Sequence, residues 1–330
     1  MIISKIQAVI YLKLILAFFT LAGGCRGSQP RAFIDGGRGR LDNGTVKIAA
    51  DKKFGGAIIW ASQSGSDKNM INNHDKGRQI QQSYYAGKSL DRKQDGQSES
   101  WSPWPWNPVQ AGNFDGDRSI VLNFECLEDN TMLYSCCQPR LWDMNEELAK
   151  CRLHQWMSFE KGMDNVIRVK NTIECFRGSD DIWGPPQARS QELPAVYAIR
   201  SMSKLVIYDG DKPWRNKPLT TVKYGPDDDW IWTRQSPTEP WAACIDPKTG
   251  IGLGIYSPET GKTWNMGWVG SAGGGGEFDA ATMHFAPLAQ WKLGPDSSKS
   301  YTYWIIIGKL EVIREKVYNL HFKFNAEDKP

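Results

Sequence analysis

The chain has 330 residues, which is enough for one large β domain or two ordinary ones with a sizeable core. Its 40 basic and 37 acidic residues leave a formal net charge of +3, which excludes the strongly basic surface by which proteins capture nucleic acid. The composition is rich in aromatic residues, with 15 Trp, 11 Tyr and 12 Phe. Any single Trp can be core filler, but so many flat indole faces favour packing against sugar rings.

The first 25 residues have the order of a secretory signal. Lys5 and Lys13 precede an apolar run, Leu14–Leu21, and small residues then lead to Cys25. The run is too short, and too interrupted by Lys13, to predict a transmembrane helix. We expect an exported protein in which Cys25 resembles the lipidated cysteine of a bacterial lipoprotein, held in the periplasm or on the cell surface. Membrane contact would then be through this lipid anchor alone. Plain secretion is the alternative, because Leu lies one position further from the cysteine than in the usual pattern.

Six further cysteines follow this signal, and an even number permits disulfides in an exported protein. They are Cys126, Cys136, Cys137, Cys151, Cys175 and Cys244. None forms a C-x-x-C pair with metal-ligand spacing, so we expect no structural zinc site. Free buried thiols are the alternative to disulfides.

From about Gln29 onward, the chain predicts short strands separated by turns rich in glycine and proline. The predicted strands cover residues 56–61, 119–124, 153–159, 165–173, 195–200, 204–208, 252–256, 281–285 and 301–307. Helical periodicity is confined to residues 144–150, a turn or two, and 310–317, a final helix or strand. Since no βαβ pattern repeats, we predict an all-β protein: a large two-sheet antiparallel β-sandwich forming a single domain over residues 26–330, or alternatively a jelly roll.

The first candidate site is the stretch HDKGRQIQQSYY at residues 74–85. If its second half is extended, alternate side chains share a face, which puts Gln79, Gln81, Ser83 and Tyr85 on one side and Ile80, Gln82 and Tyr84 on the other. In a glycoside hydrolase, Asp75 would be one of two carboxylates.

A uronate lyase is the alternative chemistry for the same stretch. Its acid, base and carboxylate-neutralising groups would come from His74, Arg78, Gln81, Gln82, Tyr84 and Tyr85. A hydrogen-bonded loop that only joins two strands is the structural alternative.

The second candidate segment, WSPWPWNPVQ at residues 101–110, places three indoles between prolines that keep the chain extended. We expect it to contact sugar, and a structural clamp at the sandwich edge is the alternative. The predicted contacts are Trp101, Trp104, Trp106, Asn107 and Gln110.

Glu192 begins a predicted apolar strand, where a carboxylate is costly unless it is paired or catalytic. An ion pair with Arg189 or Arg200 would explain it structurally. Otherwise Glu192 is the second carboxylate that glycoside hydrolysis usually needs.

Further tryptophans alternate with charged or small residues nearer the C-terminus and are predicted to line the rim of a sugar cleft. They are Trp230, Trp232, Trp241, Trp264 and Trp268. We expect no cofactor and no metal ligands. Calcium at Asp227–Asp229 or at Asn113–Asp117 is the alternative, although neither has the spacing of a known calcium loop.

Short motifs at both ends of the chain resemble galactose-mutarotase-like domains. FGGAIIW at residues 54–60 and NMINN at 69–73 are similar to the opening of such domains, and WKLGPD at 291–296 with YTYW at 301–304 to their closing strands. The resemblance implies a supersandwich fold. It does not choose the reaction, since such domains occur in sugar epimerases, polysaccharide lyases and accessory domains of glycosidases. No epimerase catalytic pattern matches the middle of the chain.

These observations predict a carbohydrate-active enzyme that cleaves glycosidic bonds in a polysaccharide or oligosaccharide. Hydrolysis by Asp75 and Glu192 is the first hypothesis, and lyase action is the second. A non-catalytic surface glycan-binding protein and a sugar epimerase are further alternatives.

Overall fold

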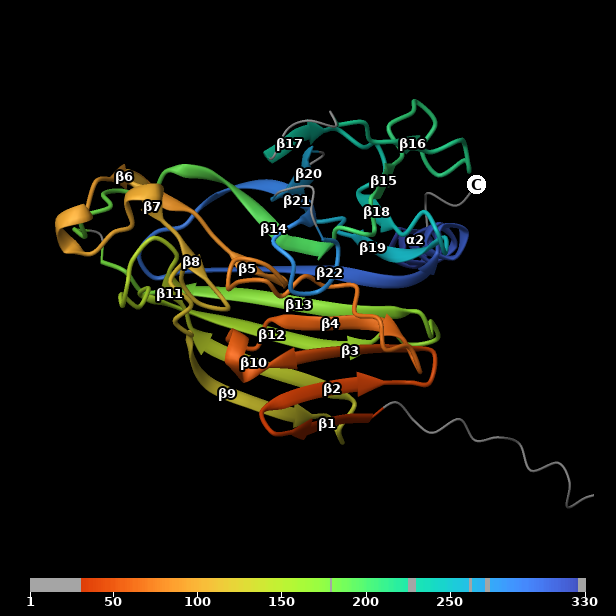
Figure 1. Ribbon diagram of the computed structural model, residues 1–330, viewed down its shortest axis with the longest axis horizontal. Coiled ribbons are helices and arrows are strands. Elements are labelled where there is room, and N and C mark those ends of the chain that lie inside the picture. Colours follow the sequence, from red (N-terminus) through yellow and green to blue (C-terminus); the bar gives the residue numbers. More distant parts are fainter. Residues whose placement is uncertain (1–30, 179, 225–229, 261–262, 271–273, 326–330) are drawn as a thin grey trace, which may run out of the picture.

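The protein is described by a computed structural model over residues 31–178, 180–224, 230–260, 263–270 and 274–325. Two antiparallel sheets face each other in these ranges, and a short hairpin stands beside them (Figure 1). This arrangement confirms the predicted two-sheet β-sandwich. Within the described ranges, no helix has the length and apolar character needed to span a membrane.

The larger sheet has 11 strands, nine of which form one continuous row. In spatial order the row is β1 (Arg31–Asp35), β2 (Arg38–Asp42), β3 (Val46–Asp51), β4 (Ile58–Gln63), β5 (Ile80–Ser83), β14 (Ala188–Ile199), β21 (Thr282–Lys292), β20 (Thr263–Val269) and β17 (Trp230–Gln235). Two short strands branch from β5, first β8 (Pro108–Val109) and then β11 (Arg140–Leu141).

The second sheet has nine strands. In spatial order they are β16 (Thr220–Thr221), β15 (Lys204–Ile207), β18 (Trp241–Ile245), β19 (Ile251–Tyr256), β22 (Ser297–Lys309), β13 (Val166–Cys175), β12 (Cys151–Phe159), β10 (Met132–Gln138) and β9 (Ile120–Leu127). The separate hairpin joins β6 (Ala86–Leu90) to β7 (Trp104–Trp106). The described helices are three 3₁₀ turns, η1 (Lys52–Phe54), η2 (Lys93–Asp95) and η3 (Glu99–Trp101), and one α-helix, α2 (Leu310–Phe324).

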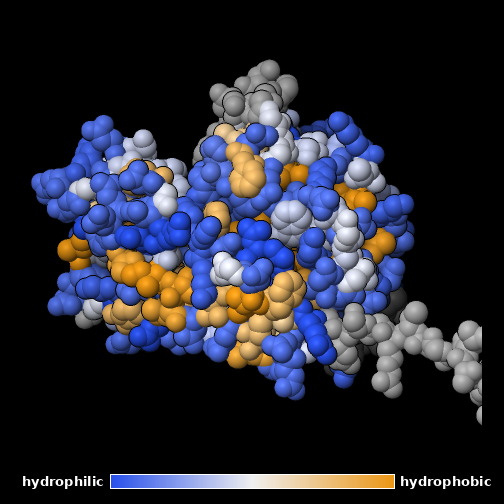
Figure 2. Space-filling view, turned by 60° about the horizontal axis from the view of Figure 1, so that its bottom comes forward, coloured by the Kyte–Doolittle hydropathy of each residue, from blue (hydrophilic) through white to orange (hydrophobic). Residues whose placement is uncertain are grey.

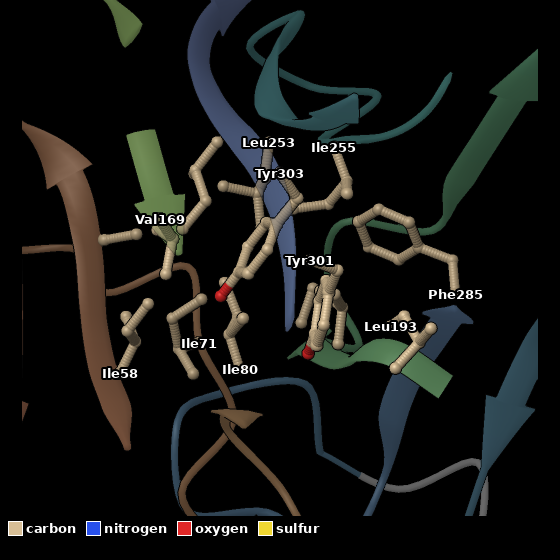
Figure 3. Close-up of a cluster of buried hydrophobic side chains, with 14 of the residues drawn as sticks. Ile58, Ile71, Ile80, Val169, Leu193, Leu253, Ile255, Phe285, Tyr301 and Tyr303 are labelled. Carbon is tan, nitrogen blue, oxygen red and sulfur yellow. The ribbon is translucent and has the colours of Figure 1, made fainter. Parts of the chain in front are cut away.

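The hydrophobic core lies between the two sheets. Figure 3 shows Ile58 and Ile80 of the larger sheet facing Val169, Tyr301 and Tyr303 of the second, and all five are fully or almost fully buried. Alternate residues of a strand point to opposite faces, so each strand contributes one apolar row to this core. The other face of each sheet is left for polar groups, and a site can form there.

The predicted final helix is present, because α2 places Ile313, Val317 and Leu320 on one buried face against β18, β19 and β22. The predicted turn of helix at residues 144–150 is wrong. Its backbone bonds elsewhere: the N–H of Leu141 donates to Glu147 O, and Leu148 bridges to Arg140. These contacts fold the segment into a loop whose end pairs with residues 140–141, just before its beginning.

All six cysteines of the described ranges carry free thiols, and five of them are buried. Burial raises the pKa of the Cys151 and Cys244 thiols well above the usual value, which keeps both side chains neutral. Of the two alternatives read from the sequence, the structure shows the free buried thiols.

Gly55 and Gly56 allow the chain before β4 to approach its neighbours closely. Both have positive φ, 60° at Gly55 and 79° at Gly56. A Cβ on Gly55 would lie 1.8 Å from the carbonyl oxygen of Gln110, and one on Gly56 would lie 2.5 Å from Ser135 of β10. The double glycine therefore allows this segment to approach both the chain that follows β8 and strand β10 of the facing sheet.

We predict that Gly55→Ala lowers the free energy of unfolding by at least about 3 kcal/mol, because the left-handed conformation and the clash with Gln110 add together. Gly65→Ala is the matched control, since Gly65 also has positive φ but a Cβ there would meet nothing within 4 Å. The control should cost only about 1–2 kcal/mol. Urea denaturation of both variants checks this, and equal losses would contradict the close approach at Gly55.

Candidate functional site

A cleft of about 170 Å³ opens on the outer face of the larger sheet, over β5 and β14. Its floor is formed by side chains of these strands, including Ser83, Glu192 and Tyr197. The turn at residues 75–78 closes one side and the aromatic segment around β7 another. The cleft therefore gathers segments that are distant in the sequence.

A one-residue bulge in β14 creates the floor. Glu192 pairs with Leu288 and Tyr197 pairs with His284, so five steps along β14 match four along β21. In a regular strand, side chains five positions apart point to opposite faces, but the extra residue turns both toward the cleft. The bulge includes Pro194, which has no N–H to give to a sheet ladder.

Glu192 is the central acidic group of the floor and is only 5% exposed. One oxygen, Oε1, lies 3.1 Å from Nε2 of the fully buried His284 and 3.4 Å from the amide nitrogen of Asn265. The other oxygen, Oε2, receives no hydrogen bond from any described residue. The carboxylate is thus held from behind and has one oxygen left for a ligand in the cleft.

Two tyrosines flank Glu192 and stay protonated. Burial raises the pKa of the Tyr85 phenol, and the nearby Glu192 carboxylate raises it further. The same two causes, in the same order, raise the pKa of Tyr197 well above its usual value. Both phenols therefore act as hydrogen-bond donors at neutral pH. They cannot supply a phenolate base in this state.

The turn at residues 75–78 carries an acidic and a basic group into the cleft. Asp75 accepts the N–H of Gly77 at 2.7 Å, and its other oxygen lies 3.6 Å from Nε of Arg78. The Arg78 guanidinium lies 5.3 Å from the centre of the Tyr197 ring. Gln81 fixes the turn, because its amide donates to the carbonyl oxygens of Lys76 and Arg78.

Three indoles form the aromatic wall of the cleft. Trp101 meets Trp104 edge to face at 5.1 Å and Trp142 at 5.6 Å between ring centres. Asn107 orients the wall, since it accepts the indole N–H of Trp104 and donates to the Ser83 hydroxyl on the floor. Trp142 can lie against the turn because Gly77 has no side chain: a Cβ there would lie 2.7 Å from its ring. Trp232 lines the cleft from β17 and stacks on His284.

The cleft brings together nine of the residues singled out from the sequence. These are Asp75, Arg78, Gln81, Tyr85, Trp101, Trp104, Asn107, Glu192 and Trp232. Alternation along β5 places Gln81, Ser83 and Tyr85 on the cleft face, as the sequence pattern predicts. Gln79, predicted on the same face, does not line the cleft, because it precedes β5 with a positive φ and its amide donates to Asp75 O. The proposed ion pair of Glu192 with Arg189 or Arg200 is absent from the described contacts, and His284 takes that place.

Other residues expected at the site lie outside the cleft, either on the surface or in the core. His74 is exposed and its ring bonds to Phe278 O outside the cleft. Tyr84 and Gln82 face the core and bond to each other. Gln110 is buried and accepts the N–H of Gln82. These side chains support the strands and cannot reach a ligand in the cleft.

Four of the tryptophans predicted to contact sugar are core residues: one from the 101–110 segment and three from the predicted rim. Trp106, Trp241, Trp264 and Trp268 are at most 2% exposed, so their predicted contact with sugar is wrong. On β20 we expected Trp264 and Trp268 at the site, but both are buried. It is Asn265 of this strand that contacts Glu192. The side chain of Trp230 lies outside the described residues.

Sequence reasoning missed Trp142, Tyr197 and His284. Tyr197 was hidden by the bulge, although Pro194 in the middle of an apolar run is a signal for one. His284 is a lone histidine between apolar residues, a pattern more typical of a core position than of a site. Trp142 stands in a short polar loop and carries no recognisable local signal.

The described residues contain no group of three or more His, Cys, Asp or Glu side chains placed to hold a metal ion. Asn113, in one loop considered for calcium, instead accepts the N–H of Asp117 and donates to Met144 O. Asp227–Asp229, the other, lies outside the described residues.

No protein-family model matches this chain, and no curated protein matches it. Solved structures similar to it include a galactose mutarotase related enzyme from Lactobacillus acidophilus, with 9% identity, TM-score 0.47, and coverage of 81% of this chain and 96% of that one. A galactose mutarotase-like protein from Clostridium acetobutylicum has 10% identity, TM-score 0.44 and coverage of 85% and 98%. A 4-alpha-glucanotransferase from Thermococcus litoralis has 10% identity, TM-score 0.42 and coverage of 85% and 40%. Galactose mutarotase-like proteins are thus among the similar structures, in line with the motif resemblance.

We predict that Glu192→Gln leaves the free energy of unfolding within about 1 kcal/mol of the wild-type value or raises it, because the amide oxygen can accept the same bonds without a buried charge. Glu239→Gln is the matched control. Glu239 is fully buried and both its oxygens accept bonds, from Trp214 N and Tyr318 at Oε1 and from Trp241 at Oε2.

In Glu239→Gln, an amide nitrogen replaces an acceptor oxygen and faces a donor. This should lower the free energy of unfolding by about 1–3 kcal/mol. Thermal and urea unfolding of the two variants measure the difference. A large loss in Glu192→Gln would assign that residue to structural support.

Proposed function

We propose that this protein is a carbohydrate-active enzyme that hydrolyses a glycosidic bond in the cleft, with Glu192 and Asp75 as its two carboxylates. The observation that carries the proposal is the free oxygen of the buried Glu192, which faces a cleft walled by indoles and shared with Asp75. Polar floor groups and aromatic walls match a ligand that has many hydroxyls and flat C–H faces.

The size of the cleft favours a small part of a glycan. Its volume of about 170 Å³ is below the range of about 300–1,000 Å³ typical of sites for drug-sized ligands. We therefore propose that one or two sugar rings enter, as at the end of an oligosaccharide. The neutral phenols of Tyr85 and Tyr197 can donate hydrogen bonds to ring hydroxyls or to the reacting oxygen.

The environments of the two carboxylates support different roles. Asp75 is half-exposed, accepts the Gly77 N–H and lies 3.6 Å from Nε of Arg78, so we assign it the role of base or nucleophile. We assign Glu192 the role of the acid: in the reacting complex it takes part as the protonated carboxyl group and gives that proton to the leaving oxygen. Water then completes the cleavage, so that one new reducing end forms for each bond broken.

Lyase action by the groups first considered has less support. His74 and Tyr84 lie outside the cleft, and the raised pKa of Tyr85 opposes its use as a base. Sugar epimerisation is the second candidate, because the small cleft pairs one carboxylate, Glu192, with neutral phenols that can return a proton.

We predict that Glu192→Gln and Asp75→Asn each lower kcat by about 100-fold or more, as loss of a positioned acid or base does. Asp115→Asn is the control, since Asp115 is an exposed aspartate in a turn outside the cleft. Purified protein is given a panel of oligosaccharides, while reducing ends, unsaturated products and optical rotation are followed together.

New reducing ends that need both carboxylates support hydrolysis. Unsaturated products would indicate elimination, and a change of rotation without cleavage would indicate epimerisation. Binding without any reaction, or full activity in both variants, would contradict the proposed chemistry.

We also predict that Trp104→Ala weakens sugar binding about tenfold, or ~1.4 kcal/mol, since an indole face is lost from the wall. Trp156→Ala is the matched control: this partly exposed indole stacks on Tyr134 on the outer face of the second sheet. Calorimetric titration with a sugar that binds the wild type compares the two. Equal weakening would place the binding surface elsewhere.

A further inference from the structure

β1 and β9 lie at the bottom of Figure 1, at one edge of the sandwich, and this edge carries an exposed apolar band. The band consists of Phe33 and Ile34 on β1, which are 45% and 37% exposed, and Ile120 and Leu122 on β9, which are each 46% exposed. These are four of the eight large hydrophobic side chains that the described residues expose, so the clustering is not an even scatter. Figure 2 shows this edge brought forward, with hydrophobic surface running along it.

The band spans both sheets. β1 is the last strand of the larger sheet and β9 is the last strand of the second, and in the described ranges neither has a further strand beside it. The N–H of Ala32 in β1 bonds to the carbonyl oxygen of Asn130 in the turn after β9, which joins the two edges at one end. Unpaired, apolar edge strands are normally avoided or covered.

One basic side chain lies over the ring of the band, and a second lies over a ring next to the band. The Arg40 guanidinium is 5.7 Å from the ring centre of Phe33, and Lys52 Nζ is 5.7 Å from that of Phe124, a partly buried ring of β9. Asp35 and Glu125 are exposed on the same strands, so the net charge here is small. Apolar contact, with cations at the level of polar headgroups, is the interaction that this surface offers.

We propose that the apolar band rests on a lipid bilayer and orients the protein on it. The proposal builds on the expected lipid anchor at Cys25, which precedes the first residue of β1 by six positions. Six residues at about 3.3–3.6 Å each reach at most ~20 Å, so the anchor would hold β1 beside the membrane. A second contact adds to the affinity of an anchor and removes the freedom to tumble.

This orientation leaves the candidate site accessible. Of the strands that line the cleft, β7, β14 and β17 lie in the upper part of Figure 1 and β5 and β8 near its middle, whereas β1 and β9 lie at the bottom. A glycan could therefore reach the cleft while the edge at β1 and β9 contacts lipid. The inference is independent of the reaction, since it concerns neither Glu192 nor Asp75.

The test uses the protein as an exporting host processes it, captured on vesicles of phosphatidylethanolamine and phosphatidylglycerol. Hydroxyl-radical labelling reports the solvent access of each side chain. We expect labelling of Phe33 and Leu122 to fall several-fold relative to Phe176 and Ile182, which are equally exposed hydrophobic residues outside the band.

A paired variant tests the cause of this protection. Phe33→Ser with Leu122→Ser should restore labelling of Ile34 on the vesicles, whereas Phe176→Ser with Ile182→Ser should leave it low. Thermal melts verify that both variants are folded. The substituted side chains are exposed, so we expect little change in stability.

Three outcomes would overturn the proposal. Failure of the vesicles to capture the processed chain would argue against the lipid anchor. Labelling of the band as strong as that of Phe176 and Ile182 would show that the surface does not contact lipid. Protection that disappears when the protein is diluted in the lipid would assign the band to a second copy of the chain.

Discussion

The candidate site depends on a single extra residue in the middle of β14. A proline inside a central strand cannot join the hydrogen-bond ladder, so the strand bulges where Leu193 and Pro194 stand. Because side chains alternate, one added residue changes which face every later side chain occupies. Glu192 and Tyr197 come to share the cleft, while Leu193 and Val196 stay in the core. A regular strand would have put the acid and the phenol on opposite sides of the sheet.

Two buried glutamates use their carboxylate oxygens in different ways. Glu239 uses both oxygens to hold Trp214, Trp241 and Tyr318, and so joins α2 to the second sheet. Glu192 uses one oxygen for His284 and Asn265, and its second oxygen is left toward an aromatic cleft. Burial of a carboxylate without full use of its acceptors is costly to folding. Such a cost is expected where an acid is retained for a ligand rather than for stability.

The candidate site and the apolar band lie on different parts of one sandwich, the first over the central strands of the larger sheet and the second at the edge where both sheets end. The aromatic and polar groups of the cleft gather where β5, β14 and the hairpin of β6 and β7 meet. The apolar band gathers where both sheets end, at β1 and β9. The core between the sheets is continuous and closely packed. It therefore fixes the position of the cleft relative to the apolar band. An enzyme tethered beside β1 would therefore present its cleft in a defined direction.

The sequence by itself determined the local part of this protein. Alternation in 165–173 predicted β13, and alternation in 79–85 put Gln81 and Tyr85 on one face and Gln82 and Tyr84 on the other, because strand periodicity is a property of neighbouring residues. The double glycine and the closing motifs indicated the class of sandwich. Only the tertiary structure decided which Trp are walls and which are core: Trp104 and Trp264 look alike in sequence, but one stands beside the cleft and the other lies between the sheets. It also brought His284 behind Glu192 and Trp142 against Gly77, since pairing between strands far apart in the chain follows from the packing of the whole core.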